Sequence, residues 1–182
     1  FKINDKFKLI DLVIDTDLNI NELKYKKPAS FNNYLFNIED TIHFREHKIK
    51  VLYKKKKFSA KGFGKIKLQN KFDEIDYLFT EKDNNFSLVS NISFSQLDIK
   101  NHDLLKIFFP LANKNINLKN HQVKINYSKD NLSVEGSGKI KLEKEFEKAD
   151  YFISKINNKI NFDEKIYLFK TLLKIDFLNF KK

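Results

Sequence analysis

The sequence predicts an all-β protein, in which repeated meander units form one elongated antiparallel β-sheet that curls into a hydrophobic groove. Three observations support this fold class. Apolar and polar residues alternate along most of the chain, which is typical of strands with one apolar face and one wet face. A glycine-containing segment occurs twice in closely similar form. Only two prolines are present in 182 residues, so nearly every residue can donate its backbone N–H to a neighbouring strand.

The repeated segment is 132–142, with the sequence LSVEGSGKIKL, and its earlier copy is 58–68, with the sequence FSAKGFGKIKL. In both copies the glycines fall on the apolar face, where a missing side chain leaves a gap that suits a bend or a close approach. We therefore expect the glycines to bend the wall of the groove or to make room for the chains of a ligand. All glycines of the protein lie in these copies: Gly62, Gly64, Gly136 and Gly138.

The repeat extends well beyond the glycine segments. His47 matches His121 at the offset that separates Gly62 from Gly136, and apolar residues upstream and downstream match as well. A series of such units buries a continuous apolar face, so an array that continues past this chain is the natural interpretation. We expect a single repetitive β-domain that is a fragment of a longer chain. Its units are about 11–84 and 85–158, followed by a truncated third unit from 159.

Turn residues divide the second unit into short strands. Lys119–Asn120 is expected to form a turn, and Arg45–Glu46 occupies the same place in the first unit. Asn157–Asn158 is expected to turn the chain into the last strand, as Asp83–Asn84 does one unit earlier. Tight turns between successive strands make neighbours antiparallel, which gives a meander. The strands expected in this unit lie near 115–119, 121–128, 131–143, 148–155 and 159–169.

Two segments break the alternation, and they contain both prolines. They are 27–38 and 101–112. In the second segment, Leu104 and Phe108 lie at helical spacing and Pro110 follows as a stop signal. We expect each segment to form a short helical insert that packs against the sheet.

The net charge of +11 invites a nucleic-acid interpretation, but the residue pattern opposes it. The 35 basic residues are interleaved with 24 acidic ones, and most aromatic residues fall on the apolar face, away from the lysines. Proteins that bind single-stranded nucleic acid need aromatic and basic side chains on the same face. The dense basic run 54–57 corresponds to the turn-like segment 128–131, so we interpret it as a solvated hairpin tip. We expect no nucleic-acid partner.

No residue pattern indicates catalysis or a metal site. The chain has no cysteine, which excludes disulfides, thiolate nucleophiles and cysteine ligands. His47 and His121 recur with the repeat, as structural residues do. The Gly-x-Gly pairs lack the third glycine, the following helix and the lysine of a phosphate-binding loop. We expect a non-catalytic protein with no cofactor, no catalytic residue and no metal site.

Two arrangements would cover the apolar face of the predicted sheet. In the first, a second sheet or the two inserts cover it, and a closed sandwich results. In the second, the sheet curls into a trough whose lining is completed by hydrocarbon, because burial of apolar area is worth about 25 cal/mol per Å² whichever molecule supplies it. The repeat favours the trough, because an elongating groove has to copy its units and a finite sandwich does not.

The residues expected to line this groove are apolar residues that alternate on one face of the strands. The opposite, lysine-rich face is expected to keep the array soluble. The expected lining is Leu12, Ile14, Leu18, Ile20, Ile49, Val51, Tyr53, Phe58, Ile66, Leu68, Phe86, Leu88, Ile92, Phe94, Val123, Ile125, Tyr127, Leu132, Val134, Ile140 and Leu142.

Four parts of the second unit carry a resemblance to a known family: LLKIFFP at 104–110, INL at 116–118, Tyr127, and LSVEGSGKI at 132–140. In strand pattern and repeat style they resemble the AsmA-like superfamily, which includes the TamB-type and YhdP-type bridge-like lipid-transfer proteins of the Gram-negative envelope. The resemblance implies a bent antiparallel sheet that encloses a hydrophobic groove. It covers most of the chain and includes no catalytic motif.

The function that the resemblance implies is that of a non-catalytic segment of a periplasm-spanning protein. Such a segment would shield phospholipid acyl chains on their way between the inner and outer membranes. The expected partners are phospholipid acyl chains and the inner membrane, the latter through an anchor outside this chain, and the expected location is the periplasm. The alternative is a structural or interaction module, a closed β-sandwich that binds a protein or an envelope polymer.

Overall fold

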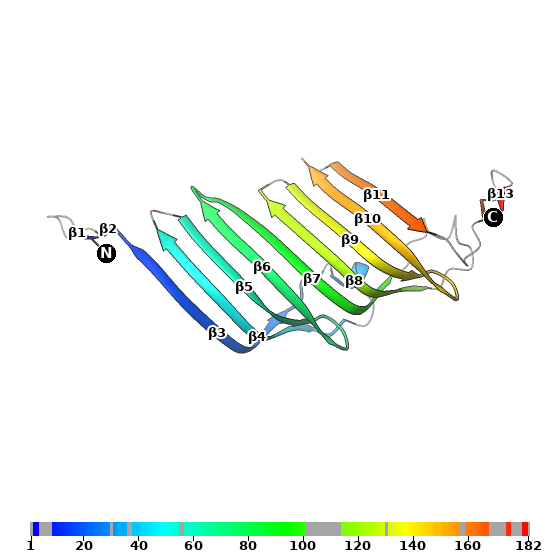
Figure 1. Ribbon diagram of the computed structural model, residues 1–182, viewed down its shortest axis with the longest axis horizontal. Helices are drawn as coiled ribbons and strands as arrows, with labels where there is room; N and C mark the ends of the chain where they lie inside the picture. Colours follow the sequence, from blue (N-terminus) through cyan, green and yellow to red (C-terminus); the bar gives the residue numbers. More distant parts are fainter. Residues whose placement is uncertain are drawn as a thin grey trace.

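The main body of the protein is one open antiparallel β-sheet of nine strands, which confirms the all-β prediction (Figure 1). The computed structural model describes residues 2–3, 9–29, 31–35, 38–54, 57–100, 114–129, 131–156, 159–167, 174–175 and 180–181. The strands follow one another in the sheet in chain order, so each strand pairs with its neighbours in the sequence, and the longer connections lie between β3 and β4 and between β7 and β8.

The nine strands of this sheet are β3 (Val13–Lys26), β4 (Thr41–Lys54), β5 (Lys57–Lys67), β6 (Phe72–Lys82), β7 (Asn85–Lys100), β8 (Asn115–Ser128), β9 (Asn131–Lys141), β10 (Phe146–Ile156) and β11 (Lys159–Tyr167). Two short pairs lie outside it: β1 (Lys2–Ile3) with β2 (Leu9–Asp11), and β12 (Lys174–Ile175) with β13 (Phe180–Lys181).

The sequence repeat is also a structural repeat. Strands β8, β9 and β10 begin at the repeat positions that match the starts of β4, β5 and β6, and each has the same length as its counterpart. Between β6 and β7, Asp83 and Asn84 have φ angles of 51° and 61°, which suits a two-residue hairpin turn. The predicted hairpin at this place is therefore confirmed, whereas Asn157–Asn158 lies outside the described residues.

The predicted turns at Arg45–Glu46 and Lys119–Asn120 are wrong, because β4 and β8 run through them as continuous strands. Each strand instead carries a β-bulge, where the register with the next strand shifts. Glu46 and Asn120 have φ angles of 55° and 51°. An extra residue in one strand bends that strand and increases its twist.

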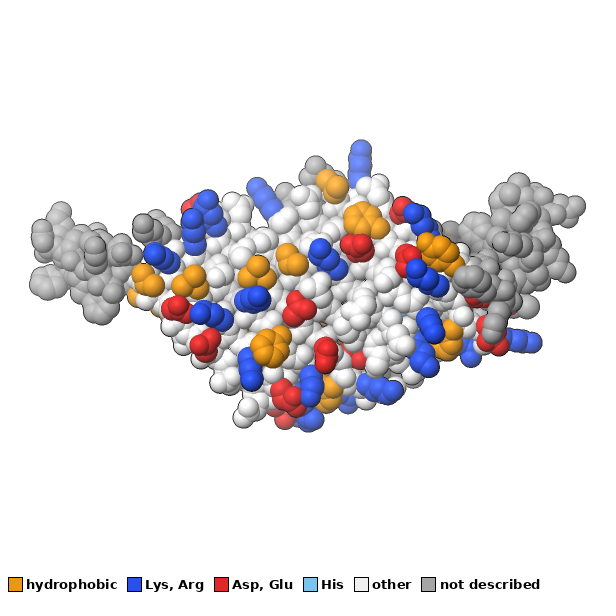
Figure 2. All heavy atoms as spheres, in the orientation of Figure 1, with side chains coloured by type: hydrophobic (Ala, Val, Ile, Leu, Met, Phe, Trp, Pro, Cys, Tyr) orange, Lys and Arg blue, Asp and Glu red, His pale blue; other side chains and the backbone are white. Residues whose placement is uncertain are grey.

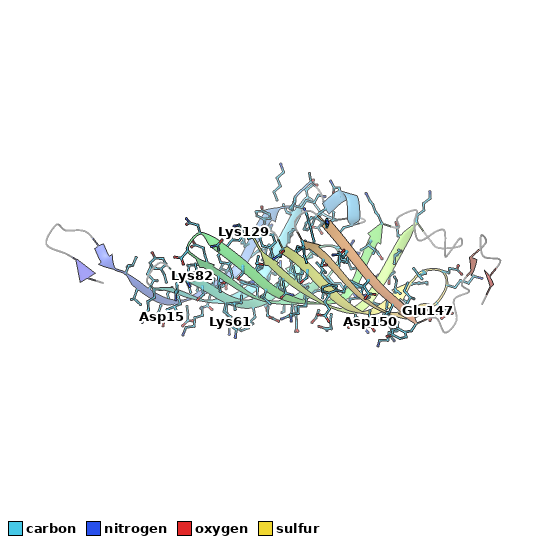
Figure 3. The ribbon with its side chains drawn as sticks, turned by 90° about the horizontal axis from the view of Figure 1, so that it is seen from above. Asp15, Lys61, Lys82, Lys129, Glu147 and Asp150 are labelled. Atoms are coloured by element: carbon cyan, nitrogen blue, oxygen red, sulfur yellow. The ribbon has the colours of Figure 1, made fainter. Side chains whose placement is uncertain are left out.

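The bulges mark the line along which the sheet folds over. The end of β3 with the start of β4, and the end of β7 with the start of β8, turn back behind the plane of the sheet (Figures 1 and 3). We call the concave side of this fold the inner face and the opposite side the outer face. The hairpin ends of the strands, such as Lys82 at the end of β6 and Ser128 at the end of β8, lie away from the fold.

The hydrophobic core lies inside the fold. One cluster joins residues from the folded-back strand ends, such as Leu97 and Ile116, to residues of the flat part, such as Ile92 and Leu142. Leu142 and Ile116 are almost completely buried. The bend is therefore held by apolar packing between the two arms of the same sheet. The full cluster is Ile42, Ile66, Leu68, Ile92, Phe94, Leu97, Ile116, Leu118, Val123, Ile140, Leu142 and Ala149.

Two buried polar side chains complete the backbone hydrogen bonds of β7, whose pairing with β6 ends at Ser93. Asp73 Oδ1 accepts a hydrogen bond from the N–H of Ser95 at 2.8 Å. The Gln69 amide accepts from the N–H of Asp98 at 2.9 Å and donates to its carbonyl at 2.7 Å. Because unpaired backbone groups are costly to bury, these side chains allow β7 to fold over beyond its partner strand.

Helical inserts were expected in 27–38 and 101–112. The first segment contains α1 (Phe31–Tyr34), a single turn of helix. Phe31 and Leu35 pack against the core cluster, and Leu35 forms a β-bridge with Ile99. The second segment lies outside the described residues.

We predict that the bulge tolerates glycine but not a β-branched residue at Asn120. Asparagine tolerates a left-handed backbone because its short polar side chain can form local hydrogen bonds, whereas a β-branched residue rarely adopts it, so Asn120→Val should lose about 1–2 kcal/mol of unfolding free energy. Asn120→Gly should lose much less, because glycine adopts positive φ without this clash. Urea unfolding followed by circular dichroism measures both variants. Equal losses in both would show that the asparagine side chain, and not the backbone angle, stabilises the bulge.

Candidate functional site

The residues predicted to line a groove share the inner face wherever they lie in the sheet. The cross-strand register places Ile14 opposite Tyr53, and Tyr53 opposite Phe58. It places Ile92 opposite Val123 in the same way. Opposite residues of an antiparallel pair project to the same side, so these pairs connect the predicted residues across successive strands. Leu12, Leu68 and Leu142 lie just outside the strand ends.

Burial divides the predicted lining into two groups, a division that alternation does not predict. On β7, Ile92 is 7% exposed and Phe86 is 45% exposed, although both face inward. Residues near the fold are core residues of the protein itself, so they are not free to line a groove: Ile66, Leu68, Ile92, Phe94, Val123, Ile140 and Leu142. Residues toward the hairpin ends are half-buried or exposed, and these form the open apolar face: Ile14, Leu18, Ile20, Ile49, Val51, Tyr53, Phe58, Phe86, Leu88, Ile125, Tyr127, Leu132 and Val134.

A row of aromatic rings crosses the open apolar face. The ring centroids of Phe58 and Phe79 are 5.8 Å apart, those of Phe79 and Phe86 are 6.3 Å apart, and those of Phe86 and Tyr127 are 5.6 Å apart. The rings come from four successive strands, β5 to β8, so the row runs across the strands and along the length of the sheet. Phe79 was missing from the predicted lining, although alternation places it on this face.

In the first unit, rings of the protein itself fill the space above the glycine pair. A Cβ atom at Gly62 would lie 2.6 Å from Cζ of Tyr77, and one at Gly64 would lie 2.5 Å from Cδ2 of His47. The expectation that these glycines make room for ligand chains is therefore corrected. The bend lies at the bulge, which is opposite Gly64 in the register.

The second unit repeats this packing. A side chain at Gly136 would overlap the ring of Tyr151, and one at Gly138 would overlap the ring of His121. The rings of His121 and Tyr151 stack with centroids 5.9 Å apart. The sequence contained a signal for these contacts, because the histidines and tyrosines recur at the same offset as the glycines.

The hydrogen bonds of His47 define its tautomer. Its Nε2 lies 3.0 Å from the carbonyl oxygen of Lys65 and must donate to it, since a carbonyl only accepts. In the neutral ring, Nδ1, which lies 3.2 Å from the hydroxyl of Tyr77, then accepts from that hydroxyl. Burial raises the pKa of Tyr77, which keeps the donating phenol protonated. His47 thus holds the bulge to the adjacent strand and to Tyr77.

His121 is fully buried, and neither ring nitrogen has a hydrogen-bond partner of good geometry. Burial lowers its pKa, and the backbone at Lys119 raises it by a smaller amount. The imidazole is therefore held in its neutral form.

The part of the chain that the structure describes contains no group of three or more His, Cys, Asp or Glu side chains that could hold a metal ion. Within the same residues, no helix has the length and apolar character needed to cross a membrane. The inner face offers mainly apolar and aromatic contact, and Glu81, opposite both Phe58 and Phe86 in the register, adds a carboxylate to it.

Comparisons with known proteins gave no match: no protein-family model, no curated protein and no solved structure is detectably similar to this chain.

We predict that a methyl group at Gly136 destabilises the fold through Tyr151. Gly136→Ala should lose about 1–3 kcal/mol of unfolding free energy, because overpacking forces the tyrosine ring out of its position. In a Tyr151→Ala background the same substitution should cost markedly less, and chemical denaturation of the four proteins of this double-mutant cycle measures the difference. A cost that is the same in both backgrounds would contradict the ring-on-glycine packing.

We predict that stability falls as the pH drops below the ordinary histidine pKa of 6.5. The unfolded chain takes up a proton there, whereas buried His121 resists protonation because its pKa is lowered in the fold. Protonation therefore favours the unfolded state progressively as the pH falls. Thermal melts from neutral to mildly acidic pH should show this decline in the natural protein and a shallower decline in His121→Gln. If the stability of both proteins declined equally with pH, groups other than His121 would be responsible for the pH dependence.

Proposed function

We propose that this chain is a non-catalytic segment of a lipid-transfer protein, and that its inner face shields phospholipid acyl chains in a hydrophobic groove. The supporting observation is that nine strands share one apolar face, which the described residues cover near the fold and leave uncovered toward the hairpin ends. Exposure on β7 rises from 7% at Ile92 to 45% at Phe86. In the described part of the chain, the hairpin side of this face has no second sheet over it.

The geometry of the open apolar face suits a long hydrocarbon chain. Neighbouring strands are spaced by about 4.8 Å, so nine strands give a face roughly 40 Å long. The row from Phe58 to Tyr127 runs in the same direction. Each methylene group that leaves water for such a face contributes about 0.8 kcal/mol. A chain lying across several strands would therefore bind through many small contacts and without specific polar recognition.

The setting of this function follows from the resemblance to the AsmA-like superfamily. On that basis the segment belongs to a periplasmic protein anchored in the inner membrane, and it carries lipid toward the outer membrane. The strands of the described sheet support such a role because their edges stay open at β3 and β11. A further unit can pair with each edge and lengthen the groove.

We predict that the protein purifies with bound phospholipid and that Phe86→Asp removes most of it. Phe86 faces inward and is exposed, so a carboxylate there would place a charge against the acyl chains without disturbing the core. Mass spectrometry of organic extracts measures the molar ratio of lipid to protein, which should fall several-fold.

The matched control is Phe63→Asp. Phe63 lies on the outer face and is 58% exposed, so the same substitution should leave the lipid ratio unchanged. Circular dichroism verifies that both variants remain folded. Absence of lipid from the natural protein, or equal ratios in the two variants, would overturn the proposal and favour a structural or interaction module.

A further inference from the structure

The outer face of the second unit has a shallow hollow beside the exposed ring of Phe152. In the register, Phe152 on β10 lies between Glu135 on β9 and Asp163 on β11. The ring is 44% exposed. The rest of the hollow is lined mainly by polar side chains of the neighbouring strands: Asn91, Gln122, Lys124, Ser137, Asp150 and Lys165.

The two units differ at one repeat position that lines the hollow. Where the first unit has Phe63, the second unit has Ser137. Ser137 projects from β9 next to β10, opposite Asp150. The small side chain of Ser137 leaves space in the hollow near Phe152, and a larger ring at this position would take up part of that space. Leu78 is the first-unit counterpart of Phe152, so the first unit has no ring at this position.

The hollow carries charges of both signs, with two lysines and three carboxylates in its lining. Of these, Asp150 also pairs with Lys148 at 3.4 Å. The same mixture extends over the outer face, where single apolar side chains stand between basic and acidic ones (Figure 2). Asp15, Lys61 and Asp150 project from this side of the curved sheet (Figure 3). A polyanion such as nucleic acid requires unopposed basic groups, and an acyl chain requires a contiguous apolar surface. The hollow offers neither, so it suits neither ligand.

A sugar can contact both kinds of group that line the hollow, the aromatic ring and the polar side chains. The face of an aromatic ring is partially negative and attracts the C–H groups of a pyranose ring. Carboxylates such as Glu135 and Asp163 accept hydrogen bonds from hydroxyl groups, and amides such as Gln122 can both donate and accept. Polar groups of this kind around one flat apolar contact fix the orientation of a small ligand.

A second exposed ring lies on the same line across the sheet. The register connects Phe63 to Phe152 strand by strand, through Asp76, Asn91, Lys124 and Glu135. Five strand spacings separate the two rings, roughly 24 Å. A chain of several sugar residues that lies across the strands would reach both rings.

We propose that the hollow beside Phe152 is a binding site for a neutral glycan chain, on the face opposite the one that we assign to lipid. The site is independent of the lipid proposal, because its residues project from the other side of the sheet.

The test is a titration of the full chain with neutral hexasaccharides of three types, built from β-linked glucose, α-linked glucose and N-acetylglucosamine, followed by calorimetry and by NMR. At least one should bind, and its affinity should change little with salt concentration. Phe152→Ala should weaken that binding at least about threefold. Ser137→Phe, which restores the first-unit residue, should weaken it by filling the hollow.

The matched control is Leu78→Ala, at the same repeat position of the first unit, and it should leave the affinity unchanged. Each variant replaces an exposed or partly exposed residue, and circular dichroism verifies the fold. Failure of all three hexasaccharides to bind would overturn the proposal. It would equally be overturned by binding that Phe152→Ala leaves intact, or by binding that salt abolishes, which would identify charge as the driving force.

Discussion

The fold of this protein depends on one extra residue in each of two long strands, β4 and β8. Strict alternation would place Leu118 and His121 on opposite faces, because His121 is an odd number of positions further along the chain. The bulge at Asn120 changes the parity, so both side chains point inward. The same shift at Glu46 brings Phe44 and His47 to the inner face. Each bulge therefore both bends the sheet and keeps its apolar side continuous through the bend.

The bend divides one apolar face into two parts with different roles. Near the fold, buried side chains such as Leu97 and Leu142 belong to one cluster, which supplies the hydrophobic core that the single sheet would otherwise lack. Toward the hairpin ends, Leu18 and Phe86 have no facing arm among the described residues and remain exposed. A sheet that stabilises itself along one side can leave the other side free for a ligand, which is the arrangement that the lipid proposal requires.

The two units share the ring-on-glycine packing of the inner face but differ at Phe63 and Ser137 on the outer face. The rings of Tyr77 and Tyr151 lie against glycines in the same way, because any side chain at the glycine would overlap the ring. On the outer face, Phe63 and its counterpart Ser137 are both exposed. Packing thus accounts for the repeated glycines and rings of the interior, while an exposed position can differ between units, as beside Phe152.

The sequence by itself determined the strand period, the identity of the two faces, the repeat and the antiparallel order, because these depend on local alternation and on turn residues such as Asp83–Asn84. Only the tertiary structure decided that Lys119–Asn120 is a bulge and not a turn. Both conformations use a residue with positive φ, and the difference lies in whether the neighbouring strands continue to pair on each side. It also decided which inward residues are core: alternation gives the face of Ile92 and of Phe86, but their depth depends on how far the sheet folds over them.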